Sequence, residues 1–204
     1  MGKTEAMARI LVSENLTLDG VMQAPGDVEE DRSGGFAHGG WAVPYFDPVM
    51  AEPAKEGGSR GASFLFGRRT YEHFATVWPD RPDDDPFANV LNHGQKFVAS
   101  RTLQEPLPWR NSTLLRGEAD DTVPGLKGRL EEDLVILGSG QLVQALMGRG
   151  LIDEFRLLIH PLTLGSGRRL FPEGGAPARF RLLGTQTTGT GVVIATYGPE
   201  PGDA

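Results

Sequence analysis

Cysteine is absent from this chain of 204 residues. Its absence excludes disulfides, thiolate zinc sites, iron–sulfur clusters and cysteine nucleophiles. Long apolar runs are also missing, since none approaches the roughly 20 residues that a membrane-spanning helix needs. The first residues, MGKTEAMARI, lack the apolar core of a signal peptide. We therefore expect a cytoplasmic protein that does not contact a membrane.

Basic residues are scarcer than acidic ones, and the formal net charge is −7. General nucleic-acid binding is not expected, because it needs a basic face that displaces counterions from phosphates. Hydrophobic residues make up 39% and charged residues 23% of the chain, which is typical of a globular protein. We expect a single domain at 8–198, between flexible tails at 1–7 and 199–204.

Short apolar segments separated by glycine and proline alternate between strand and helix patterns. Strands are predicted at 8–13, 63–66, 96–100, 112–116, 134–138 and 154–165. Helices are predicted from near Asp47 and at 69–77, 87–94, 120–130 and 141–147. The last segment, FRLLGTQTTGTGVVIATYG, predicts two strands joined through 189–191. This order predicts an α/β fold with a mixed, mainly parallel central sheet, helices on both faces and a C-terminal antiparallel hairpin.

The stretch FLFGRRT places a glycine, two arginines and a threonine at a predicted strand end: Gly67, Arg68, Arg69 and Thr70. Unpaired N–H groups at a helix start attract anions, and arginine adds permanent charge. The motif therefore suits a phosphate site. It suits equally well a solvated basic surface in which Thr70 caps the helix.

Two further junctions favour the phosphate interpretation. VILGSGQL follows a buried strand with the small residues Gly138, Ser139 and Gly140, although Val143 stands where a dinucleotide fingerprint has its third glycine. FVASRTL ends a strand with Ser100 and Arg101. Ligands of open α/β sheets gather at the carboxyl ends of strands, so three such junctions point to one site.

The motifs LTLDG, FGRRTYE, FVASRTL, LGSGQLVQALM and GLIDEFRLLIHPLTLGSGRRLF occur in this order. In this arrangement the chain resembles the dihydrofolate reductase-like superfamily, and within it the RibD C-terminal domain branch of riboflavin biosynthesis reductases. The resemblance implies a bound NADPH and a homodimer. It assigns to the cofactor the residues of the three junctions: Gly67, Arg68, Arg69, Thr70, Ser100, Arg101, Gly138, Ser139, Gly140, Gln141 and Leu142.

Hydride transfer to a C=N or C=O bond also needs a proton. Asp19 in TLDG is the first candidate, because an aspartate recurs near the substrate in the riboflavin-type branch; the other interpretation is an Asp-Gly turn. Asp47 is the rival in WAVPYFD, which resembles the carboxylate motif of dihydrofolate reductases. Phe46 stands where the carboxylate belongs, and one residue rotates a helical position by about 100°. Asp47 is therefore expected to cap a helix.

Aromatic residues are candidates for a wall against a flat substrate ring, although most aromatic residues at such spacings are core residues. The substrate-pocket candidates are Trp41, Tyr45, Phe46, Phe74, Trp78 and His160. Ser166 and Gly167 are further cofactor candidates. No metal site is expected, and the His/Cys zinc signature of a fused deaminase is absent.

Three functions compete at this point. The first is an NADPH-dependent reductase of a small heterocyclic, carbonyl or imine substrate. The second is a non-catalytic NADP-binding protein that kept the cofactor pocket. The third is a structural dimer module, which predicts no nucleotide binding.

Overall fold

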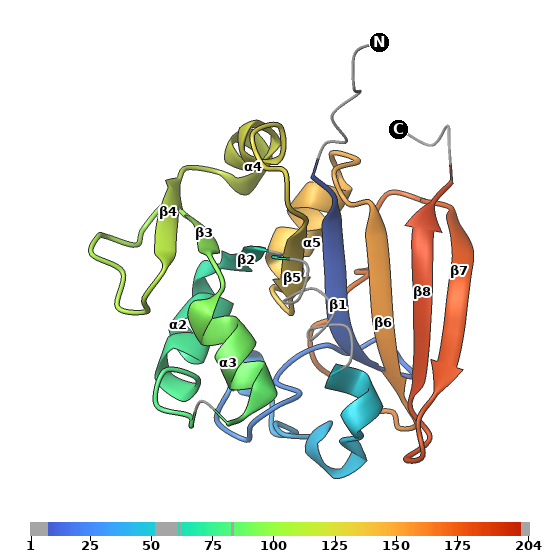
Figure 1. Ribbon diagram of the computed structural model, residues 1–204. Helices are drawn as coiled ribbons and strands as arrows, with labels where there is room; N and C mark the ends of the chain where they lie inside the picture. Colours follow the sequence, from blue (N-terminus) through green and yellow to red (C-terminus); the bar gives the residue numbers. More distant parts are fainter. Residues whose placement is uncertain (1–7, 52–60, 62, 83, 201–204) are drawn as a thin grey trace.

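The computed structural model describes residues 8–51, 61, 63–82 and 84–200. An eight-stranded sheet with the strand order β4-β3-β2-β5-β1-β6-β8-β7 runs through it (Figure 1). The strands are β1 (Ile10–Thr17), β2 (Ser63–Gly67), β3 (Lys96–Ser100), β4 (Ser112–Arg116), β5 (Leu134–Leu137), β6 (Glu154–His160), β7 (Phe180–Thr187) and β8 (Val193–Pro199). Among the strands of the described residues, the pairs β6–β8 and β7–β8 are antiparallel and the other pairs are parallel. The predicted mixed, mainly parallel sheet with a C-terminal antiparallel hairpin is confirmed.

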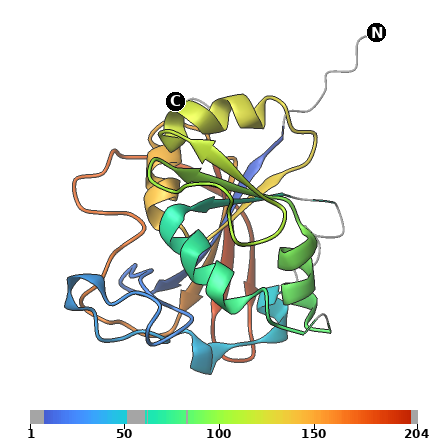
Figure 2. The same cartoon turned by 90° about the vertical axis from the view of Figure 1, so that its left-hand side faces the viewer.

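Helices cover both faces of the sheet, as predicted (Figure 2). The α-helices are α2 (Arg68–Val77), α3 (Pro86–His93), α4 (Ala119–Lys127) and α5 (Gly140–Met147). Three 3-10 turns lie in the loop after β1: η1 (Ser33–Gly35), η2 (Val43–Tyr45) and η3 (Pro48–Ala51). Apolar residues of α4 and α5 pack on one face, and those of α2 and α3 pack on the other.

Strand β1 lies in the middle of the sheet, between β5 and β6. Its side chains point alternately to the two faces of the sheet, and the two faces have different surroundings. Ile10, Val12 and Leu16 belong to the core that α4 and α5 cover. Glu14 is buried in the same row of alternate residues, so this core contains one carboxyl group.

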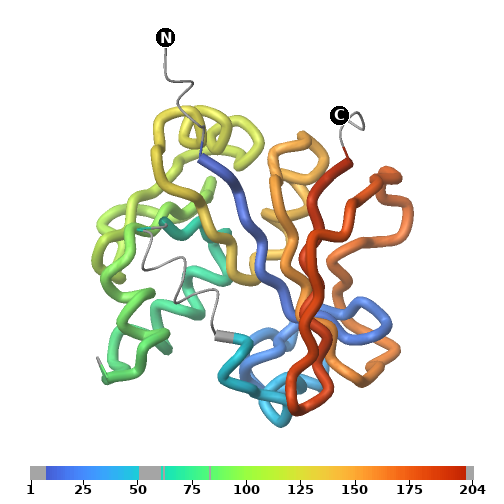
Figure 3. Tube along the Cα trace, turned by 45° about the vertical axis from the view of Figure 1, so that its right-hand side comes forward, coloured from blue at the N-terminus to red at the C-terminus, as the bar shows by residue number. Residues whose placement is uncertain are grey.

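The loops that follow β1 and β6 lie side by side at one end of the sheet (Figure 3). Val21 and Arg169 form an isolated antiparallel bridge between them. The amide of Met22 also donates to the carbonyl of Arg168 at 2.8 Å. The loops after β1 and β6, which are far apart in the sequence, thus pack against each other and cover this end of the sheet.

Several predicted boundaries differ from the structure. The strand predicted at 154–165 ends at His160, because Pro161 has no N–H for a ladder and Leu162 folds back onto the carbonyl of His160 at 2.8 Å. Strand β8 includes Pro199, the first residue of the segment predicted as a tail at 199–204. The predicted tail at 1–7 and residues 201–204 of the second predicted tail lie outside the described residues.

Asp47 caps a short turn, as expected. Its Oδ1 atom accepts from the amide of Val49 at 3.0 Å, where the 3-10 turn Pro48–Ala51 begins. Its Oδ2 atom accepts from the amide of Gly189 at 2.9 Å. Both carboxylate oxygens are therefore committed to the backbone. The remainder of the helix predicted from Asp47 lies outside the described residues.

Candidate functional site

Four neighbouring parallel strands, in the order β3, β2, β5 and β1, have their carboxyl ends at the same end of the sheet. A cavity of about 1510 Å³ opens there and is lined by residues from all four strands. It extends along the sheet as far as Arg9, Asp133 and Glu154, at the opposite ends of β1, β5 and β6. All eleven residues predicted to bind the cofactor line this cavity: Gly67, Arg68, Arg69, Thr70, Ser100, Arg101, Gly138, Ser139, Gly140, Gln141 and Leu142. The structure thus brings the three junctions to a single cavity.

The turns after β2 and β5 are joined directly. Gly138 and Ser139 have φ angles of 63° and 61°, in the left-handed region. For Ser139 this conformation is uncommon, and such residues concentrate at functional sites. The Ser139 Oγ atom accepts a hydrogen bond from the amide of Gly67 at 3.1 Å. The starts of α2 and α5 are therefore held next to each other.

Helices α2 and α5 both begin without a side-chain cap. Their first N–H groups have no partner within the helix and carry the positive end of the helix dipole. Leu142 Cβ lies 3.6 Å from the position that a Cβ atom on Gly67 would take, so any larger residue at 67 would narrow the space between the turns. This pair of helix starts suits an anionic group.

Three arginines surround the helix starts. Arg68 pairs with Glu72 at 3.1 Å, and Arg101 pairs with Glu118 at 2.7 Å. Arg69 is exposed and has no hydrogen-bond or ion-pair partner within the part of the chain that the structure describes. The Ser100 Oγ atom accepts from the amides of Thr102 and Leu103, both at 3.1 Å, and keeps its own proton to donate.

The aromatic candidates separate into two groups. Phe46, Phe74 and Trp78 line the cavity, and Phe46 is 66% exposed. Trp41 and His160 are buried and do not line it. Tyr45 is also outside the lining, and its ring packs on that of His160.

Trp41 and His160 lie in the core and outside the cavity lining, so their place in the substrate pocket stays a prediction. Trp41 Nε1 donates to the carbonyl of Gln23 at 2.7 Å, and its ring meets that of His160 edge-on at 5.1 Å. His160 Nε2 lies 3.0 Å from Asn15 Oδ1. Burial lowers the pKa of His160 to about 4, so the ring stays neutral at neutral pH.

Asp19 also lies outside the cavity lining. Its carboxylate accepts from the Thr17 hydroxyl at 2.6 Å and from the amides of Leu164 and Gly165 at 3.2 and 2.8 Å. The Thr17 hydrogen bond is the main cause that lowers the pKa of Asp19, and the two amides add to it. A carboxylate held ionised in this way is a poor proton donor, so the surroundings favour an anchor for the loop after β6.

Glu14 lines the cavity and was missed in the sequence. Its side chain is 3% exposed, and its Oε2 atom has no hydrogen-bond partner within the described residues. Burial is the main cause that raises the pKa of Glu14 to about 8. The available signal was a single acidic residue within the apolar alternation ILVSENLT. A charged group in such a position is either paired or neutral.

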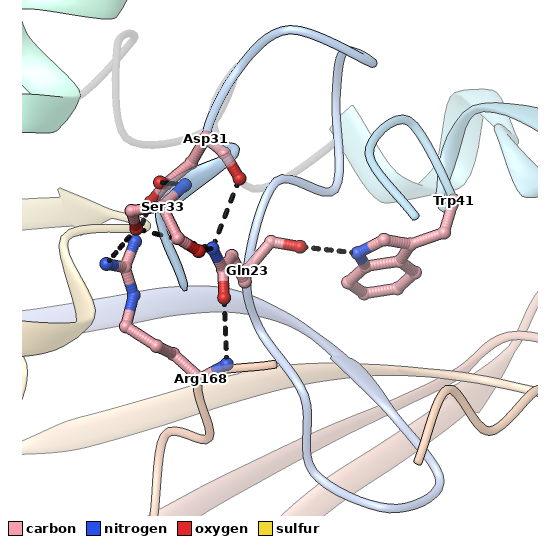
Figure 4. Close-up of polar contacts among 5 residues, drawn as sticks. All are labelled: Gln23, Asp31, Ser33, Trp41 and Arg168. Carbon is pink, nitrogen blue, oxygen red and sulfur yellow. Dashed lines mark hydrogen bonds and ion pairs between the residues drawn. The ribbon is translucent and has the colours of Figure 1, made fainter. Parts of the chain in front are cut away.

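Gln23 connects the acidic loop after β1 to the loop after β6 (Figure 4). Its Nε2 atom donates to the carbonyls of Asp31 and Ser33 at 3.1 and 3.0 Å, and its Oε1 atom accepts from the amide of Arg168 at 3.0 Å. Arg168 also forms an ion pair with Asp31 and donates to Ser33 Oγ at 2.9 Å. These bonds hold the acidic loop along one border of the cavity.

Ser166 and Gly167 are not in the cavity lining, so the structure does not bring them to the predicted cofactor site. Gly167 instead packs inside the loop after β6. A Cβ atom at this position would lie 2.7 Å from the side chains of Phe36 and Val21.

None of the described helices combines the length and apolar character that crossing a membrane requires. The described residues also hold no cluster of three or more histidine, aspartate or glutamate side chains arranged for a metal ion.

Comparison with known proteins gives consistent results. The profile of the RibD C-terminal domain matches residues 8–194. YyaP of Bacillus subtilis strain 168 is 28% identical over 138 residues, which cover 66% of this chain and 72% of YyaP. YwjB of the same organism is 30% identical over 130 residues, which cover 64% of this chain and 70% of YwjB.

Two solved structures share the fold. A protein from Shewanella sp. PV-4, assigned to riboflavin biosynthesis, is 21% identical with a TM-score of 0.70, and the match covers 94% of this chain and 99% of that one. Dihydrofolate reductase from Enterococcus faecalis, complexed with NADP(H) and RAB-propyl, is 14% identical with a TM-score of 0.61. The match covers 94% of this chain and 96% of that one. The fold is therefore dihydrofolate reductase-like, as predicted.

Proposed function

The chain belongs to the RibD C-terminal domain family, and on that premise we propose that it is an NADPH-dependent reductase of a small heterocyclic, carbonyl or imine substrate. The observation that carries the proposal is the joined pair of turns after β2 and β5, beside which Arg68, Arg69 and Arg101 line one cavity. A fold of the reductase type and a site suited to a phosphorylated, elongated ligand thus coincide.

The residues of the cavity fit such a cofactor. Ser100 and Arg101 would hold the 2′-phosphate, since an arginine and a hydroxyl recognise phosphate oxygens with charge-assisted hydrogen bonds. The turns 67–70 and 138–142 would hold the pyrophosphate with backbone amides. When bound, the dihydronicotinamide supplies a hydride, and the protein orients it and excludes water.

The substrate would lie against the aromatic side chains of the cavity. Phe46, Phe74 and Trp78 offer apolar faces, and the same cavity is lined by the polar side chains of Ser13 and Asn15. Flat rings stack on aromatic side chains, and a few polar groups fix their orientation. This combination suits a small heterocycle or a conjugated carbonyl compound.

The cofactor choice can be tested by titrating NADPH and NADH into the protein and into Arg101→Ala. We expect NADPH to bind about tenfold more weakly to the variant, since one charge-assisted contact to the 2′-phosphate is lost. NADH lacks this phosphate, so its affinity should stay within about twofold. Arg129→Ala is a matched control, because Arg129 is an exposed arginine outside the cavity lining. Absence of nucleotide binding would overturn the proposal in favour of a structural module.

Turnover separates the reductase from a non-catalytic NADP-binding protein. We expect some compounds in a panel of cyclic imines, quinones and aldehydes to be reduced by the protein with oxidation of NADPH. The loss of NADPH absorbance measures this oxidation. Tight NADPH binding without oxidation by any compound of the panel would favour the non-catalytic alternative.

A homodimer is also proposed, and the edge strand β7 is its candidate contact. Leu182 and Leu183 on this strand are 53% and 47% exposed, beside the register shift between Leu182 and Gly184. Exposed edge strands with apolar side chains are prone to pair with another chain. Light scattering should give the mass of a dimer for the protein and of a monomer for Leu182→Glu; a monomer in both would contradict the proposal.

A further inference from the structure

Glu14 is a buried acid on the central strand of the sheet. Its side chain lies on the same face as Val12 and Leu16, toward α5. It lines the cavity, and its Oε2 atom is left without a hydrogen-bond partner by the described residues. A buried polar atom without a partner is costly, and a ligand in the cavity that Glu14 lines would supply the missing partner of its carboxyl group.

The strand order indicates which part of the cofactor would reach Glu14. Ser100 and Arg101 follow β3, the joined turns follow β2 and β5, and β1 is the next strand along the same edge. If β3 meets the 2′-phosphate and the two turns meet the pyrophosphate, an extended dinucleotide reaches β1 with its nicotinamide end. This step rests on the proposed function.

We propose that Glu14 binds the nicotinamide end of the cofactor, by donating a hydrogen bond from its neutral carboxyl group to the carboxamide oxygen. A carboxyl group has a proton to donate only while it is un-ionised. Burial raises the pKa of Glu14 to about 8, and the charge of Glu30 adds to this, against a backbone hydrogen bond at Asn15. The donor form therefore dominates at neutral pH.

Few charged groups surround Glu14. Glu30 acts on it electrostatically. Asp27, Asp31 and Arg168 line the same border of the cavity, and the last two form an ion pair with each other. Helix α5 and strand β5 contain no titratable residue, and the neighbours on the same face of β6 are apolar. A pH dependence of cofactor binding above neutral pH would therefore report mainly on Glu14.

Calorimetric titration with NADPH and with 2′-phosphoadenosine diphosphoribose tests the proposal. The second ligand carries the same 2′-phosphate and pyrophosphate but no nicotinamide, so the ratio of the two affinities cancels phosphate ionisation. The titrations run from about pH 6 to about pH 9.5, which brackets the ionisation of Glu14. For the unmodified protein we expect this ratio to fall about tenfold as the pH rises, because the donor is lost.

Two variants complete the test. Glu14→Gln keeps an N–H donor of similar shape, so its ratio should stay high and independent of pH. Glu14→Ala should give a ratio about tenfold lower than that of the unmodified protein at the acidic end. Circular dichroism melts would show that both variants fold.

The outcomes are distinguishable. If neither ligand binds, the cofactor proposal fails, and the role of Glu14 fails with it. If both ligands bind and the ratio is the same for the unmodified protein and the glutamine variant at every pH, the proposal for Glu14 alone is overturned.

Discussion

The end of β1 and the turn that follows it carry two carboxylic acids in opposite environments. Glu14 is on the strand and buried, and its Oε2 atom has no hydrogen-bond partner among the described residues. Asp19 is in the turn, half-buried, and accepts hydrogen bonds from Thr17, Leu164 and Gly165. The pKa of Glu14 is raised to about 8, whereas that of Asp19 is lowered.

This contrast shows that environment, rather than motif, sets the protonation state. Asp19 belongs to the recognisable motif TLDG, yet its hydrogen-bond donors stabilise the ionised form. Glu14 belongs to no motif, yet burial stabilises its neutral form. We therefore infer that Asp19 anchors the loop after β6 and that Glu14 is the acid available to a ligand.

The largest expected effect is the pH dependence of stability that Glu14 causes. Its folded pKa of about 8 exceeds the ordinary 4.5, so the native state holds a proton that the unfolded state has lost between these values. This contribution is fully present below pH 4.5 and is lost as the pH rises through 8. It amounts to about 5 kcal/mol. Urea unfolding of the unmodified protein should therefore show stability falling with pH relative to Glu14→Gln.

The difference in stability between the unmodified protein and Glu14→Gln cancels the contributions of other titrating groups. His160, whose pKa is lowered to about 4, contributes stability that rises with pH between 4 and 6.5 in both proteins. The glutamine side chain resembles the neutral acid and does not titrate. Parallel stability curves for the two proteins would show that Glu14 ionises normally and would remove the contrast with Asp19.

The second effect is a loss of stability in Asp19→Ala. The variant leaves the Thr17 hydroxyl and the amides of Leu164 and Gly165 without their acceptor, so we expect the free energy of unfolding to fall by about 2 kcal/mol. The stabilisation is lost as the pH falls below the ordinary pKa of 3.8 toward the lowered folded pKa. Urea unfolding at neutral and acidic pH measures both the loss of stability in the variant and its dependence on pH.

Asp80→Ala is the matched control, because Asp80 is an exposed acid outside the cavity lining. It should change the stability by less than about 0.5 kcal/mol. The conservative variant Asp19→Asn tests the remaining catalytic prediction. If it abolishes NADPH oxidation while its stability and NADPH affinity are kept, Asp19 acts in the reaction, and the anchor interpretation is wrong.

Sequence patterns predicted the sheet and the cavity edge well because those signals are local. Apolar runs mark the strands, and glycine and small residues mark the turns between them, as at Gly67 and at 138–140. Parallel strands then bring their carboxyl ends together without further information. The presence of all three junctions at one cavity follows from these two facts.

The pocket assignments could not be read in the same way. Whether an aromatic residue faces a cavity or the core depends on how the loops after β1 and β6 cross, and this is a tertiary property. Trp41 and His160 are buried by that crossing, whereas Phe46 is left at the cavity. Glu14 was missed for a related reason, since its burial depends on the packing of α5 and the acidic loop.

The smallest expected effect concerns the charge of Glu30. This residue raises the pKa of Glu14 electrostatically, but less than burial does. Glu30→Gln keeps an acceptor for the amide of Gly26, which now donates to Glu30 Oε2 at 2.7 Å, and removes the charge. A like-charge interaction near a surface is worth about 0.2–1 kcal/mol, so the pH midpoint of NADPH binding should move down by a fraction of a unit.

Salt distinguishes the two causes of the raised pKa. Screening weakens the repulsion from Glu30, so the difference between Glu30→Gln and the unmodified protein should shrink from low salt to about 1 M. The effect of burial on the pKa of Glu14 is insensitive to salt, so most of the increase in this pKa should persist at high salt. If high salt instead returned the midpoint to that of an ordinary glutamate, repulsion would be the main cause. The contrast between Glu14 and Asp19 would then be one of neighbouring charges rather than of burial and hydrogen bonding.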